Sequence, residues 1–265
     1  MDELDYIRRR GVVLETAVDA NRILSLINRL KPIKTQHELM RVGPDRDGGY
    51  LIPDDIHGIT SCFTASSDME DPVSFEQDLL ESFGIKSHLT NHSMEEVPKY
   101  FTPLSFMQRL LGPNNDSKSI TLDSWMKGTI DYEYCGAYQS ILRVDCHGNE
   151  YGALLSTSEE VLTRFRIIVL KLNDIDKWGH PAFFKIAEAL INKILQNFNV
   201  VHLHPNNQIP IRNINGVDLP GILEITFLAI KRCKMLGYVE SLPDELDRTC
   251  HPEITDIALP DIWYK

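Results

Sequence analysis

Acidic and histidine residues follow an apolar run in the segment 142–155, LRVDCHGNEYGALL. The run predicts a buried strand, and the residues after it predict an amphipathic helix. Asp145, His147 and Glu150 therefore stand at the carboxyl end of a strand, where open α/β sheets bind their ligands. His147 could remove a proton from a hydroxyl group, because imidazole titrates near neutral pH. In the alternative, Asp145 caps the next helix and His147 has no chemical role.

Polar residues also end the apolar run 166–172, RIIVLKL. Alternation along this predicted strand places Lys171 and Asn173 on one side, toward the same crevice. Lys171 could form an ion pair with Asp145 or Glu150, or it could hold an anionic ligand. The sequence leaves these alternatives open.

Two histidines alternate in the run 199–204, NVVHLH. His202 and His204 share one face of a predicted strand. Together with Asp145 they could bind a divalent metal or position a substrate hydroxyl, since imidazole and carboxylate are common metal ligands. A pair of hydrogen-bonded histidines is the alternative, and the sequence does not identify a metal.

The composition is that of an ordinary globular protein, with 43% hydrophobic and 25% charged residues over a length of 265. The formal net charge of −11 argues against a nucleic-acid partner, because phosphate binding needs a basic surface. No run approaches the ~18 apolar residues of a membrane span. The first residues, MDELDYIRRRG, lack the apolar core of a signal peptide, and the five cysteines lack paired spacing. We expect a cytoplasmic protein without a membrane span.

An amphipathic helix is predicted near the amino terminus, within residues 17–32. Four apolar residues recur at helical spacing: Ile23, Leu26, Ile27 and Leu30. Pro32 ends the helix. We expect residues 1–37 to form a helical extension that packs on a single domain of residues 38–265. A homodimer contact through the same helix is the alternative.

Strands and helices alternate over the rest of the chain. Strands are expected at 58–66, 85–90, 139–145, 166–172, 199–204 and 221–230. The segment 120–128 is expected to hold a brief strand and then a helix capped by Thr121. Helices are also expected at 72–84, 150–165 and 181–198, and the segment 100–119 is expected to be helical or irregular. This order predicts an α/β fold: a Rossmann-like, doubly wound, mostly parallel sheet of about seven strands. No helix separates the last two strands, which predicts that the last strand is antiparallel.

Six segments occur together in one order: RVGPDRDGGYLIPDD, VSFEQDL, ITLDSWM, LRVDCHGNEYGALL, VVHLHPNN and LPGILEITFL. In this order they resemble the FkbM-type methyltransferases, and the likeness spans residues 38–263. The resemblance implies a class I methyltransferase fold and S-adenosylmethionine as cofactor. It also implies O-methylation of a sugar or another small-molecule hydroxyl, in a setting such as glycan or capsule modification.

The resemblance also implies roles for individual residues. His147 or His204 would be the catalytic base, with Asp145 orienting the substrate or a divalent metal. The cofactor would be bordered by Ser66, Ser67, Asp68, Glu76 and Asn91. The substrate would meet Asp47, Tyr50, Glu150, Lys171, Asn173, His202 and Asn206.

Four places in the predicted crevice depart from the family pattern. Serines 66 and 67 stand where glycines are expected, and Asn91 stands where an acidic residue accepts the ribose hydroxyls. His147 replaces a glutamate, and Lys171 with Asn173 replaces a Glu-x-His sequence. These departures support a second hypothesis: a methyltransferase-like protein that has lost methyl transfer and serves as a binding or scaffolding partner.

Overall fold

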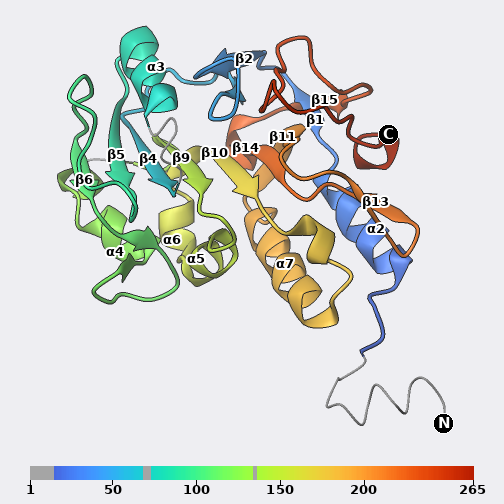
Figure 1. Ribbon diagram of the computed structural model, residues 1–265. Coiled ribbons are helices and arrows are strands. Elements are labelled where there is room, and N and C mark those ends of the chain that lie inside the picture. The colour runs from blue at the N-terminus through green and yellow to red at the C-terminus, as the bar shows by residue number, and fades with distance from the viewer. Residues whose placement is uncertain (1–14, 68–72, 134–135) are drawn as a thin grey trace.

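A seven-stranded sheet forms the centre of the computed structural model, which describes residues 15–67, 73–133 and 136–265 (Figure 1). The spatial order is β11-β14-β10-β9-β4-β5-β6. Its strands are β4 (Ser61–Ser66), β5 (Lys86–Thr90), β6 (Ser105–Met107), β9 (Ser140–Asp145), β10 (Phe165–Leu172), β11 (Phe198–Pro205) and β14 (Leu223–Ala229). The first five pair in parallel, and β14 pairs antiparallel with both β10 and β11. The prediction of a mostly parallel α/β sheet is confirmed, and the sheet is compatible with a Rossmann-like fold.

Helices cover both faces of this sheet, as a doubly wound arrangement requires (Figure 1). One face carries α4 (Leu122–Lys127), α5 (Glu150–Ser156), α6 (Glu159–Leu162) and α7 (Pro181–Ile194), whose buried side chains join the larger apolar core. The opposite face carries α3 (Ser74–Phe83) and the antiparallel pair of β2 (Leu39–Val42) and β3 (Tyr50–Pro53). The sheet therefore lies between two apolar layers.

The expected amino-terminal helix is present as α2 (Ala20–Leu30). Asp19 caps it by accepting a hydrogen bond from a backbone N–H of the first turn. All four apolar residues expected on one face are buried within the chain's own core, at 2% exposure or less: Ile23, Leu26, Ile27 and Leu30. A dimer contact through α2 would have to use its other side chains, so the homodimer stays a prediction.

Short elements fill the connections. The strands are β1 (Ile33–Thr35), β7 (Leu110–Leu111), β8 (Ser119–Ile120), β12 (Arg212–Ile214), β13 (Val217–Leu219) and β15 (Met235–Tyr238). They form three two-stranded sheets, β1 with β15, β7 with β8, and β12 with β13. The 3-10 helices are η1 (Ile130–Glu133), η2 (Ile175–Lys177), η3 (Ile230–Arg232) and η4 (Asp261–Trp263). Among the described residues, no helix is both long and apolar enough to cross a lipid bilayer.

Three expected elements differ from the structure. The segment 100–119 was expected to be helical or irregular, but it supplies β6, the edge strand of the sheet. The strand expected near residue 120 pairs instead with β7, outside the main sheet. The helix expected over 150–165 is interrupted at Thr157, whose backbone is extended. Ser158 caps the second piece, so a local hydrogen bond divides the helix.

The strand order reverses between β4 and β9. From β4 the chain adds β5 and then β6 on one side, and β9 and β10 lie on the other. Ser66 and Asp145 are register partners at the carboxyl ends of these two strands. Open α/β sheets bind ligands at such a switch point, so the residues that follow β4 and β9 line the candidate site.

Candidate functional site

The ends of β4 and β9 are tied together at the switch point. The backbone N–H of Ser67 donates to the carbonyl oxygen of Asp145 at 2.9 Å, and the Ser67 hydroxyl donates to the same oxygen at 3.2 Å. Ser66 is buried beside them. Asp68 was also expected to border the cofactor, and it lies outside the described residues.

An imidazole and a carboxylate stand together after β9. The Asp145 side chain is 2% exposed, whereas that of His147 is 56% exposed, and its Nε2 lies 3.9 Å from Oδ1 of Asp145. That Oδ1 is buried and makes no hydrogen bond to any other described residue. His147 has a φ of 46°, a left-handed conformation that histidine adopts more readily than most residues. The turn therefore presents His147 to solvent beside a buried carboxylate.

Lys171 holds two carboxylates at the end of β10. Its Nζ donates to Asp47 at 2.9 and 2.8 Å and to Asp145 at 3.3 Å. Burial works against both charged forms, but the mutual attraction outweighs it: the pKa of Lys171 lies above its usual value and that of Asp47 below. The expected pairing of Lys171 with Asp145 is present, and Asp47 is a second partner. One lysine and two aspartates leave a net negative charge.

Glu150 binds backbone donors. Its carboxylate accepts from the N–H groups of Gly148 at 2.7 Å and Asn173 at 2.8 Å, and from the Asn173 side-chain amide at 3.1 Å. Burial raises the pKa of Glu150 even though these bonds favour the anion. Glu150 and Asn173 are both predicted to meet substrate. In the structure, the hydrogen bonds between them join the loops that follow β9 and β10.

Two residues expected at the cofactor have other partners. Glu76 is fully buried, accepts from the Thr64 hydroxyl at 2.5 Å, and forms an ion pair with Arg143 at 3.2 Å. The oxygen of Asn91 accepts from the backbone N–H groups of residues 93 and 94 at 2.8 and 2.9 Å. Tyr50 is buried against the guanidinium of Arg143, with 5.3 Å between the Tyr50 ring centroid and the guanidinium carbon.

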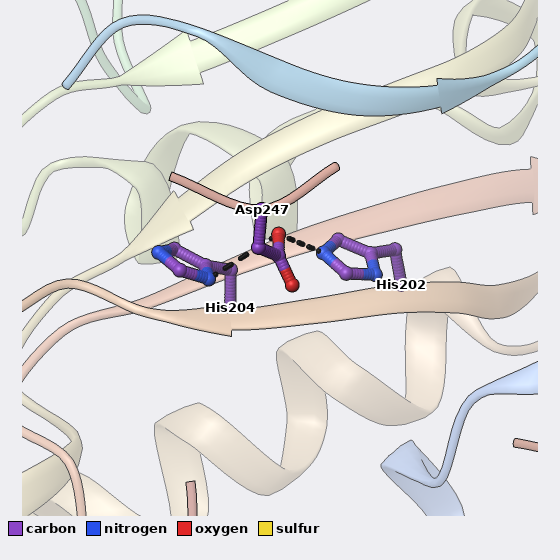
Figure 2. Close-up of side chains that lie close together, drawn as sticks. All are labelled: His202, His204 and Asp247. Atoms are coloured by element: carbon purple, nitrogen blue, oxygen red, sulfur yellow. Dashed lines mark hydrogen bonds and ion pairs between the residues drawn. The ribbon is translucent and has the colours of Figure 1, made fainter. Parts of the chain in front are cut away.

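The two histidines of β11 meet a third residue. Figure 2 shows the carboxylate of Asp247 between the rings of His202 and His204. Its Oδ1 lies 2.9 Å from Nε2 of His202 and 3.3 Å from Nδ1 of His204. The carboxylate beside the histidines therefore belongs to Asp247, whereas the expected partner, Asp145, is bound by Lys171.

Asn206 connects Glu224 on β14 with the carboxylate of Asp47 that Lys171 binds. Its amide donates to Oδ1 of Asp47 and to Oε1 of Glu224, both at 3.1 Å. Burial and the nearby Asp47 raise the pKa of Glu224. Cys250 donates from its thiol to the same Glu224 oxygen at 3.3 Å. A continuous set of polar contacts thus runs from Cys250 and Glu224 through Asn206, Asp47 and Lys171 to Asp145 at the end of β9.

Four residues of these contacts are not among those predicted from the sequence: Arg143, Glu224, Asp247 and Cys250. Arg143 and Glu224 are charged residues inside apolar strands, and such a residue needs a buried partner, so this pattern could have identified them. Asp247 lies in a long loop and has no comparable feature.

Comparisons with protein-family models, with curated proteins and with solved structures found no match. The resemblance to FkbM-type methyltransferases stays a prediction.

Proposed function

We propose that this chain is an S-adenosylmethionine-dependent O-methyltransferase that acts on a hydroxyl of a sugar or another small molecule. The observation that carries the proposal is the placement of Ser66, Ser67, Asp145 and His147 on the two sides of the switch point. The strand order, with β14 antiparallel between β10 and β11, supports the class I methyltransferase type within the broader α/β fold.

The crevice fits a positively charged cofactor in one respect. A lysine beside a sulfonium group would repel it, but Lys171 is bound by Asp47 and Asp145, and the three side chains sum to a negative charge. Bound S-adenosylmethionine would supply the methyl group. Ser66 and Ser67 are small residues at the end of β4, where they would border it.

His147 is the proposed base. Its exposed imidazole can take the proton of an acceptor hydroxyl, and the buried Asp145 would orient the ring and stabilise the imidazolium that forms. His204 is less suited to this role because it is 8% exposed and lies next to Asp247. General base catalysis contributes about 10²–10⁴-fold to rate, so loss of the imidazole should reduce methyl transfer by that order.

The first experiment is calorimetric titration of the purified chain with S-adenosylmethionine and with S-adenosylhomocysteine. Saturable binding of either would support the proposal, and no heat from a folded sample would contradict it. A panel of sugars then serves as acceptors, with release of S-adenosylhomocysteine as the readout. We expect His147→Asn to keep the affinity for S-adenosylmethionine and to lose turnover. His57→Asn, at another exposed histidine, is the control and should keep both.

The second candidate function is a methyltransferase-like binding protein without activity. Asn91 supports it, because the side-chain oxygen that would accept a ribose hydroxyl already accepts two backbone N–H groups. The same titration separates the two candidates, since the inactive protein would bind neither form of the cofactor.

A further inference from the structure

A small cavity of about 10 Å³ lies beside β11. This volume is of the order that a single water molecule or metal ion requires. The polar side chains that line it come from β2, β3, β11, β14 and the loop after β15: Arg41, Tyr50, His202, His204, Glu224, Thr226 and Asp247.

Three of these side chains bring metal-binding atoms together. One nitrogen from each of His202 and His204 and one oxygen of Asp247 lie within 4.8 Å of one another. The other oxygen of Asp247, Oδ2, accepts from the backbone N–H of Asp244 at 2.8 Å, which leaves Oδ1 turned toward the rings (Figure 2). Two imidazoles and one carboxylate are a common ligand set for divalent transition metals.

His204 lacks the hydrogen bonds that a buried imidazole needs. The residue is 8% exposed, and neither ring nitrogen makes a hydrogen bond to any residue in the described part of the chain. Its Nδ1 is near Asp247 only as an ion-pair contact at 3.3 Å. The contact with Asp247 does not have hydrogen-bond geometry, and a metal ion between Nδ1 and Oδ1 of Asp247 would accept the lone pairs of both atoms.

The charge around the cavity is suited to a cation. Asp247 and Glu224 both line it. Asp47 lies near Glu224, because the Asn206 amide donates to both carboxylates. Arg41 is the one cation among the polar lining side chains named above. Its guanidinium donates to backbone carbonyl oxygens at 2.6, 3.1 and 3.2 Å, in the turn after β2, so its donors are directed to that turn.

We propose that His202, His204 and Asp247 bind one divalent transition-metal ion, and we expect zinc to bind. Three protein ligands of this kind leave a coordination position for water or a ligand, as in catalytic zinc sites. The site is separate from the crevice at β4 and β9. The proposal does not depend on methyl transfer, because zinc binding and S-adenosylmethionine binding are measured independently.

A second set of atoms competes for the same ion. His204 also groups with Glu224 and Cys250, whose ligand atoms likewise lie within 4.8 Å of one another. The two sets differ in one chemical respect, since only the second contains a thiol. A cobalt(II) spectrum distinguishes them, because a thiolate ligand gives an intense near-ultraviolet band that imidazole and carboxylate do not.

The test uses the full chain after treatment with a chelator and dialysis. Zinc is titrated in competition with a chromophoric chelator, and stoichiometry is measured by mass spectrometry of the metal. We expect one zinc per chain, a rise in melting temperature with zinc by mass action, and a cobalt spectrum without the thiolate band. His202→Ala and Asp247→Asn should each reduce the affinity for zinc at least about 100-fold. Loss of a residue that only hydrogen-bonds a metal ligand already reduces metal affinity by about 10–100-fold.

The controls keep the proposal open to contradiction. His180→Ala, at an exposed histidine without a side-chain capping bond, should bind zinc as the unsubstituted chain does. Circular dichroism checks that each variant is folded, and the isosteric Asp247→Asn is a second test if His202→Ala fails to fold. No competition with the chelator by the unsubstituted chain would overturn the proposal. A thiolate band, or loss of zinc in Cys250→Ser without loss in His202→Ala, would also overturn it.

Discussion

Replacing Lys171 with methionine would leave the buried carboxylate of Asp145 and the half-buried carboxylate of Asp47 without the ammonium group that binds both. At an effective dielectric of about 20, the contacts of 2.8 Å with Asp47 and 3.3 Å with Asp145 correspond to gross attractions of about 6 and 5 kcal/mol. The variant also saves the cost of burying the ammonium group, which reduces the net loss. Removal of one partner of a buried ion pair typically costs about 3–5 kcal/mol.

Proton uptake sets an upper limit on this penalty. Neutralising an aspartate of ordinary pKa at pH 7 costs about 4 kcal/mol, and that cost falls by about 1.4 kcal/mol for each unit by which the pH is lowered. We therefore expect Lys171→Met to lower the free energy of unfolding by about 3–4 kcal/mol at pH 7, and by clearly less at pH 5. In the unsubstituted chain, Asp47 does not take up a proton between pH 7 and pH 5, because Lys171 keeps its pKa below the usual value.

Urea unfolding at the two pH values measures this difference. Asp47→Asn combined with Lys171→Met should recover part of the loss, since one of the two uncompensated charges is gone. Lys185→Met, at an exposed lysine on α7, is the matched control and should change stability by no more than about 0.5 kcal/mol. A loss below about 1 kcal/mol for Lys171→Met, or an equal loss at both pH values, would refute the reasoning.

Three further predictions concern stability. Glu76→Gln should lower the free energy of unfolding, measured in urea, by about 3 kcal/mol, because it leaves the buried Arg143 without its anion. A loss smaller than about 1 kcal/mol would contradict this, since substitutions at the surface already change stability by up to about 0.5 kcal/mol. Gly49→Ala should prevent stable folding, since its Cβ would lie 1.9 Å from a backbone oxygen, whereas Gly84→Ala meets open space and should cost only about 1 kcal/mol, by thermal unfolding. The lowered pKa of Asp47 means that its ionised form stabilises the fold above the unfolded value of about 3.9, and this stability is lost as the pH falls through the folded value. Asp47→Asn should remove that acid-sensitive part, which unfolding measured between neutral and acid pH would detect as a shallower slope.

Long apolar runs made most of the sheet predictable. The strands β4, β5, β9 and β14 fall within the expected ranges, β10 begins one residue before its range, and β11 extends one residue beyond its range at each end. Strands covered on both faces need continuous hydrophobic residues, which makes them visible in the sequence. The edge strand β6 has only three residues, all half-buried, and its pairing with β5 stabilises it rather than its own composition. Short edge strands of this kind carry little information in their local sequence.

The candidate site was predictable where it follows directly from a strand. Asp145 and Lys171 end adjacent parallel strands, so their proximity follows from the fold. Asp247 lies 45 residues beyond its partner His202, in a loop without regular structure. Only the tertiary packing places it between the histidines, and alternation along β11 could predict the pair but not the third residue.

The reversal of strand order has a consequence for how fast the chain folds. Ser61 at the start of β4 pairs with Ser140 at the start of β9, 79 residues later. Bringing the ends of a flexible loop of that length together costs about 4 kcal/mol of chain entropy before the pairing stabilises it. Contacts this distant in sequence slow folding, so we expect the junction of β4 and β9 to form late. The ligand crevice would then be completed only after each side of the sheet has formed its own neighbouring strand pairs.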